Sequence, residues 1–159
     1  WSANTSMTYT DVKARLLAAV APTAALGRKT ISGGRLNIYN ALTGRVPERV
    51  AGPSEDAWVG SAYSVESGHD YVDNANEVFT VNVPGARFIR VHFSRVAMEE
   101  NYDFLRVIDA NGEEVESLTG ALEDYTSTYV EGDTLRLNMV TDSSIPAWGF
   151  AVDRVDYIL

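Results

Sequence analysis

The chain has 159 residues, of which 45% are hydrophobic and 22% are charged, and it contains no cysteine. This length supports one ordinary hydrophobic core with a smaller appendage, and no stretch approaches the roughly 20 apolar residues that span a bilayer. The formal net charge of −9 argues against nucleic acid as a partner, because phosphate binding requires a basic surface. No basic segment followed by an apolar stretch opens the chain, so no signal peptide is visible.

The charge is distributed unevenly along the chain. Residues 1–60 contain seven Lys or Arg and four acids, whereas residues 61–159 contain six Arg, no Lys and eighteen acids. This difference predicts two distinct modules, the second of which suits a hard cation. The absence of cysteine leaves two interpretations open: a cytosolic protein, or a secreted module that a metal ion stabilises in place of disulfides.

Two short helices are expected in the first module. Ser6 or Thr8 suits the N-cap of a helix over residues 9–20, in which apolar side chains recur at helical spacing. The pair Gly33-Gly34 permits a tight turn or a close backbone approach before a second helix over residues 35–42. Two such helices bury too little apolar surface to form a domain, so they must pack on the second module or on protein absent from this sequence.

Residues 47–60 combine Pro, Gly and scattered charges, which favours a linker or an irregular crossing segment. From residue 77 onward apolar and polar side chains alternate, the pattern of strands with one buried face. Short strands at this spacing, separated by turn signals, are typical of an antiparallel β-sandwich. The runs with this pattern are residues 79–83, 88–93, 104–108, 135–139 and 150–157.

The last of these runs changes its parity. Phe150 and Val152 share one face of an ideal strand, whereas Val155 and Tyr157 share the other. One extra residue between the two pairs would return all four side chains to the same face. The pattern therefore predicts a β-bulge near Asp153-Arg154.

The first module carries a specific phrase, Ser32-Gly-Gly-Arg-Leu-Asn-Ile-Tyr-Asn-Ala-Leu42, preceded by Thr8-Tyr-Thr-Asp-Val-Lys-Ala-Arg-Leu-Leu17. Together these segments resemble the last two helices of a subtilisin-like serine protease domain. In that family the helix that begins with the nucleophilic serine would end near Trp1-Ser2, and the other catalytic groups lie further upstream. The resemblance therefore implies a non-catalytic C-terminal remnant, residues 1–46, of a secreted serine endopeptidase, with no catalytic residue in this chain.

The second module, residues 61–159, also carries a recognisable set of stretches. They are Phe88-Ile-Arg-Val-His-Phe-Ser94, Tyr102-Asp-Phe-Leu-Arg-Val107, Gly132-Asp-Thr-Leu135 and Thr141-Asp-Ser-Ser144 with Trp148-Gly-Phe150. This set resembles the CUB family, in a cysteine-free form found after secreted bacterial proteases. The resemblance implies a mainly β, CUB-like sandwich of jelly-roll type that follows the helical segment and the linker at 47–60.

Many members of that family bind calcium through three acids, and the resemblance places these ligands at Glu99, Asp103 and Asp142. Glu100 competes with Glu99 for the first position, and backbone carbonyls near Ser144 are further candidates. Ca²⁺ takes six to eight oxygen ligands, which carboxylates from separate loops supply. Without a cation three clustered anions would repel one another and raise their own pKa values. The residues alone also allow a simpler interpretation, in which the glutamates are solvated and Asp142 only caps a turn.

Two other groups of polar residues suggest no chemistry. His92 falls on the face of its strand opposite the apolar side chains, so we expect a surface or edge histidine, and we expect His69 in a loop. The acids Glu113, Glu114 and Glu116 are expected to be solvated at a strand edge or in a turn.

Taken together, these features predict an accessory region that stabilises a parent protease or binds its protein or polysaccharide substrate. The alternative is a free-standing carbohydrate- or protein-binding module, because exposed aromatic rings stack on sugars, although aromatic side chains more often fill a core. Trp148, in the loop that carries Asp142, is the strongest candidate for a sugar contact. The aromatic residues in question are Trp58, Tyr63, Tyr71, Tyr125, Tyr129 and Trp148.

Overall fold

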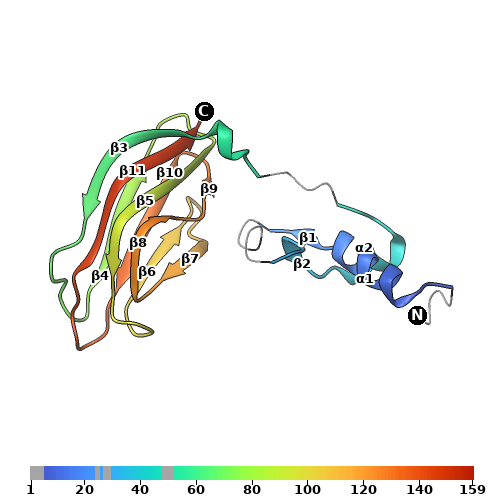
Figure 1. The fold of residues 1–159 in the computed structure, drawn as a ribbon, viewed down its shortest axis with the longest axis horizontal. Coiled ribbons are helices and arrows are strands. Elements are labelled where there is room, and N and C mark those ends of the chain that lie inside the picture. The colour runs from blue at the N-terminus through green and yellow to red at the C-terminus, as the bar shows by residue number, and fades with distance from the viewer. Residues whose placement is uncertain (1–5, 24–25, 27–29, 48–51) are drawn as a thin grey trace. The chain divides into compact units, whose positions relative to one another are not determined.

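The computed structural model describes residues 6–23, 26, 30–47 and 52–159. The chain divides into two compact units, Trp1–Gly52 and Pro53–Leu159. The first contains short helices and a short pair of strands, and the second is built mainly from strands (Figure 1). The expected end of a nucleophile helix at Trp1-Ser2 lies outside the described residues, and the division into residues 1–46, 47–60 and 61–159 stays a prediction.

Helix α1 (Tyr9–Ala18) begins where the sequence predicts and ends two residues earlier. Thr8 is the N-cap: its side chain accepts a hydrogen bond from the Asp11 backbone N–H at 3.2 Å, and the Asp11 carboxylate accepts one from the Thr8 backbone N–H at 2.9 Å. This reciprocal capping box satisfies two backbone donors that a helix N-terminus otherwise leaves free.

Helix α2 (Ile38–Thr43) begins three residues later than predicted, because Arg35 belongs to a strand. Strands β1 (Ala21–Pro22) and β2 (Gly34–Arg35) pair in antiparallel fashion. Gly34 makes the close backbone approach expected of the glycine pair, since a Cβ atom there would lie 2.3 Å from the Ala21 carbonyl oxygen.

The two helices leave much apolar surface exposed. Asn40 is buried and donates to the Ala19 carbonyl at 3.2 Å, which ties α2 to the end of α1. On the surface of the unit, however, Tyr39 is 68% exposed and Leu42 is 63% exposed. Within the described part of the chain, no helix is long and apolar enough to cross a membrane.

The second unit is an antiparallel β-sandwich of two sheets (Figure 1). One sheet has the strand order β4-β10-β6-β7, and the other has the order β3-β11-β5-β8, with β9 also paired to β5. A short 3₁₀ helix, η2 (Glu55–Ala57), precedes the first of these strands. The strands are β3 (Val59–Glu66), β4 (Asn76–Asn82), β5 (Phe88–Ala97), β6 (Phe104–Ile108), β7 (Glu114–Leu118), β8 (Ala121–Thr126), β9 (Val130–Glu131), β10 (Thr134–Val140) and β11 (Gly149–Ile158).

The core lies between the two sheets and is built from the inward-facing residues of the predicted strands. Phe150 on β11 packs edge-on against Phe79 on β4 at 5.0 Å between ring centroids, and against Phe93 on β5 at 6.1 Å. The register of β11 shifts between Val152 and Arg154 against both of its neighbours, which confirms the predicted bulge.

Strands β3, β7, β8 and β9 were not predicted, because their polar residues hide the alternation. Glu116 on β7 shows the cause most clearly, since the expectation that it is solvated is wrong: it is 8% exposed. Its carboxylate accepts hydrogen bonds from the Tyr125 hydroxyl on β8 at 2.6 Å and from the Thr128 backbone N–H at 2.7 Å. Glu116 thereby joins the two sheets, whereas Glu113 and Glu114 are exposed as predicted.

Replacing Glu116 tests this bridge between the sheets. Glu116→Ala is expected to lower the free energy of unfolding by roughly 3 kcal/mol, because the Tyr125 hydroxyl and the Thr128 N–H lose a charged acceptor. The matched control is Glu114→Ala on the same strand, whose exposed pair with Arg106 at 3.5 Å should contribute no more than about 0.5 kcal/mol. Urea unfolding measures both, and equal effects of the two variants would contradict the role of Glu116.

Candidate metal centre

Two loops at one end of the sandwich, β5–β6 and β10–β11, carry the three acids singled out by the sequence. Glu99 follows β5, Asp103 directly precedes β6, and Asp142 follows β10. Because Phe104 at the start of β6 pairs with Val140 at the end of β10, the residues just beyond those strand ends are brought side by side. The pairing of β6 with β10 therefore places two of the acids together.

The three carboxylates are close enough to share one ion. Each offers one oxygen, and these oxygens all lie within 4.8 Å of one another. Ligands of a single Ca²⁺ lie at 2.3–2.6 Å from the ion, so two of them are separated by at most about 5 Å. A donor set of carboxylate oxygens alone suits a hard cation such as Ca²⁺ and gives no soft ligand for zinc or copper.

Asp103 is the fixed member of the group and has no exposed surface. Its Oδ1 accepts a hydrogen bond from the Asp142 backbone N–H at 2.7 Å, and its Oδ2 accepts one from the Tyr71 hydroxyl. Burial and the bond to Asp103 raise the pKa of Tyr71 to about 12, so the phenol stays a hydrogen-bond donor at all ordinary pH values. The buried carboxylate is thus held in one orientation by two donors.

Tyr71 belongs to this site, although the sequence singled it out only as one of six aromatic residues that could contact a sugar. It is 3% exposed, and its hydroxyl also accepts a hydrogen bond from the Glu99 backbone N–H at 3.0 Å. One phenol from the β3–β4 loop therefore bonds to both ends of the β5–β6 loop, at the Glu99 N–H and at the Asp103 carboxylate. Tyr71 lies 28 residues before Glu99 in the chain, and no local spacing signals the contact.

The Glu99 carboxylate lies in an electrostatically unfavourable environment. Its Oε2 atom is buried and, among the described residues, has no hydrogen-bond partner. Burial, followed by the negative charges of Asp142, Asp103 and Asp73, raises the pKa of the Glu99 carboxyl above its ordinary value of 4.5. A buried carboxylate oxygen without a donor, on a side chain close to two other anions, is the expected signature of a cation ligand.

The competing residue Glu100 is exposed and does not belong to the group of three acids, which contains Glu99. Asp142 does cap a turn, since its Oδ1 accepts from the Ser144 backbone N–H at 2.9 Å. That turn and membership of the acidic group coexist, because a carboxylate has two oxygens. The suggestion that backbone carbonyls near Ser144 add further ligands stays a prediction.

The remaining polar candidates lie elsewhere on the sandwich. The expectation of a surface or edge position for His92 is wrong, because β5 is an inner strand and His92 is 6% exposed beneath two aspartates. His69 lies in a loop as predicted, and its ring stacks on Trp148 at 3.9 Å between centroids. The Arg95 guanidinium lies 4.5 Å from the centroid of the Trp148 ring, so this ring is no bare platform for a sugar.

All six aromatic candidates for a sugar contact lie in the described part of the chain, and none of them is fully exposed. Tyr71 is buried in the core cluster, and Tyr63 and Tyr125 are partly buried against it. This distribution favours the interpretation of these residues as core and rim.

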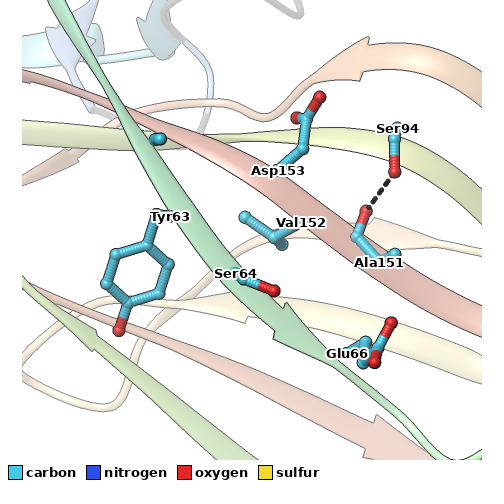
Figure 2. A pocket seen from close by; sticks show the side chains of 8 residues that line it. Tyr63, Ser64, Glu66, Ser94, Ala151, Val152 and Asp153 are labelled. Atoms are coloured by element: carbon cyan, nitrogen blue, oxygen red, sulfur yellow. Dashed lines mark hydrogen bonds between the residues drawn. The ribbon is translucent and has the colours of Figure 1, made fainter.

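A shallow groove of about 460 Å³ lies on the outer face of the five-stranded sheet, away from the acidic group. Figure 2 shows it between β3, β11 and β5, with Ser94 donating to the Ala151 carbonyl. Its two carboxylates already have partners, because Glu66 pairs with His69 at 3.3 Å and Asp153 pairs with His92 at 2.6 Å. The acidic group is therefore the better candidate for a functional site.

Comparisons with known proteins give partial matches. No family model matches the chain. It is 35% identical over 89 residues to the E3 ubiquitin-protein ligase HERC2 of Homo sapiens, a stretch that covers 54% of this chain and 2% of that protein. It is 33% identical over 92 residues to the zinc finger ZZ-type and EF-hand domain-containing protein 1 of Homo sapiens, covering 55% of this chain and 3% of that protein. The matched part of the chain thus spans only 2–3% of the length of these relatives.

Among solved structures, the second CUB domain of MASP-1, crystallised bound to Ca²⁺, matches with a TM-score of 0.42 and 11% identity. That match covers 60% of this chain and 90% of the other. A likeness at this level is distant.

The raised pKa of Glu99 yields a prediction for the protein without metal. In EDTA, Glu99→Gln is expected to be more stable than the wild type at about pH 7.5, because the variant removes one of three crowded charges. When folding raises the pKa of a carboxyl, the folded protein becomes less stable as the pH rises and that carboxyl ionises. The stability advantage of Glu99→Gln over the wild type should therefore shrink as the pH falls toward about 4.5 and Glu99 is protonated.

Urea unfolding of both proteins across that pH range measures the difference. Glu100→Gln is the control and should match the wild type throughout, since Glu100 is exposed. If the difference in the free energy of unfolding between Glu99→Gln and the wild type stays constant with pH, folding does not raise the pKa of Glu99.

Proposed function

We propose that this chain is a non-catalytic accessory region whose CUB-like β-sandwich is stabilised by Ca²⁺. Glu99, Asp103 and Asp142 are the proposed ligands. The hydrogen bond from the Tyr71 hydroxyl orients the Asp103 carboxylate. The observation that carries this proposal is the buried, unpartnered Oε2 atom of Glu99 within a group of three carboxylates. A bound cation supplies the missing partner and neutralises most of the local charge.

The composition of the second unit supports a structural role for the ion. The chain has no cysteine, and the three proposed ligands come from two loops that are distant in sequence, Glu99 and Asp103 from β5–β6 and Asp142 from β10–β11. A metal that closes such loops stabilises the folded state as a disulfide does, because the unfolded chain cannot assemble the ligands. No catalytic role is proposed for any of the three acids.

Thermal unfolding with Ca²⁺ and with EDTA tests the proposed site. When free Ca²⁺ exceeds its Kd by 100-fold, the folded state gains about 2.7 kcal/mol, which corresponds to a rise in Tm of roughly 8 °C for a domain of this size. Glu99→Gln and Asp142→Asn are expected to lose most of this rise, whereas the control Glu100→Gln keeps it. A wild-type Tm that is the same in Ca²⁺ and EDTA would remove the calcium assignment.

We further propose that the first unit belongs to the C-terminal end of a secreted subtilisin-like serine endopeptidase, and that the sandwich stabilises this enzyme or binds its protein or polysaccharide substrate. The phrase Ser32–Leu42 supports the parentage by resemblance. The exposed apolar side chains of the helical unit support it physically, because Tyr39 and Leu42 leave a surface that water disfavours. In this proposal the rest of the catalytic domain of the parent protease packs against this apolar surface and shields it from water.

Hydrogen exchange tests this part of the proposal. In the 159-residue chain the amides of α1 and α2 are expected to exchange within seconds, because little buried surface protects them, while those of β5 remain protected. Fusion behind a subtilisin-like catalytic domain that lacks its own last two helices should slow exchange in α1 and α2 by at least about tenfold. Equally strong protection of these helices without any such domain would favour an independent unit.

The second candidate function is a free-standing module that binds a protein. It is favoured by the matches of about 90 residues within two much longer proteins of other kinds, which suggest a unit reused in different chains. A carbohydrate ligand is less well supported, because His69 and Arg95 lie against the Trp148 ring.

A further inference from the structure

His92 is a buried titratable residue that the candidate metal centre does not use. It lies in the middle of β5, on the outer face of the five-stranded sheet, and its side chain is 8% exposed. Its Nδ1 lies 2.6 Å from Asp153 Oδ1 on β11, and its Nε2 lies 3.0 Å from Asp124 Oδ1 on β8. The ring therefore links three adjacent strands, with a carboxylate at each nitrogen.

Local backbone features on both flanking strands aim these carboxylates at the ring. Asp153 is the extra residue of the β11 bulge, where the register shifts between Val152 and Arg154, and Figure 2 shows its carboxylate on the outer side of the strand. Asp124 has a φ of 51°, a left-handed conformation that non-glycine residues seldom adopt. Both features redirect a side chain that a regular strand would place elsewhere.

The protonation state of His92 decides how many of these bonds exist. A neutral imidazole has one N–H donor and one bare nitrogen, whereas the imidazolium has two donors. Two ionised carboxylates, one at each nitrogen, are both satisfied only by the imidazolium. With a neutral ring, one carboxylate faces a lone pair and is repelled.

We propose that His92 is a pH-dependent clamp across β8, β5 and β11, which holds both flanking strands when its ring is protonated and releases Asp124 when the ring is neutral. Asp124 is the carboxylate released because its contact is the longer one and its side chain is 95% exposed, against 52% for Asp153. Water therefore replaces the ring at Asp124 with little cost, while the shorter bond to Asp153 persists.

The two arginines that flank His92 on this face are hydrogen-bonded to other carboxylates, and the charge of Arg154 also acts on Asp153. Arg154, the β11 residue opposite His92, donates to Asp156 at 2.7 Å. Arg90, two residues before His92 on β5, donates to Asp156 at 3.2 Å and to Glu55 at 3.0 Å. The bond from His92 lowers the pKa of the Asp153 carboxyl, which keeps that carboxylate ionised through the pH range in which histidine titrates.

Nuclear magnetic resonance of the ¹⁵N-labelled 159-residue chain tests the clamp directly. Spectra are recorded at an acid and at an alkaline pH that both leave the sandwich folded. Both His92 ring nitrogens should carry a proton at the acid pH, and only Nδ1 should do so at the alkaline pH. A ring that carries the same number of protons at both pH values would overturn the proposal.

The stability of Asp124→Asn provides a second, independent measurement. The unfolding equilibrium constant of this variant should exceed that of the wild type about threefold at the acid pH, where the clamp is closed, and match it at the alkaline pH. Both measurements are repeated in a His69→Gln background, because His69 is the other histidine of the chain and its pKa is raised by its bond to the Trp148 carbonyl. The same ratio at both pH values would likewise overturn the proposal.

Discussion

A carboxylate with no exposed surface, that of Asp103, is the constraint around which one end of the sandwich is arranged. A buried charge is costly unless donors surround it, and here the Tyr71 hydroxyl and the Asp142 backbone N–H fill that role. Since Tyr71 also receives the Glu99 N–H, three loops are positioned by one buried group. The arrangement leaves Glu99 close to two other anions, and that unfavourable placement is the physical basis for the proposed cation.

Charged residues perform in this chain the linking role that disulfides have in many small β domains. Glu116 joins the two sheets through Tyr125 and Thr128. His92 joins three strands of one sheet, and the acidic group joins two loops. Such links depend on protonation or on a bound ion, so they give the fold a sensitivity to pH and calcium that a covalent bond would not give.

The two units differ in how completely they bury their apolar side chains. The sandwich has a continuous core between its sheets, including Phe93 and Phe150 with no exposed surface. The helical unit buries Ala19 and Val20, yet keeps large apolar side chains in water. A self-contained core beside an incomplete one agrees with the proposal that only the second unit is a whole domain.

Local sequence determined the capping of α1, the strands β4, β5, β6, β10 and β11, and the bulge at Asp153, because each depends on neighbours within a few residues. It also drew attention to Glu99, Asp103 and Asp142. Only the tertiary structure decided that Glu116 and His92 are buried and that Tyr71 supports Asp103. Each of those outcomes requires a partner from another strand or loop, and the pairing of distant strands is not written in the periodicity of any one segment.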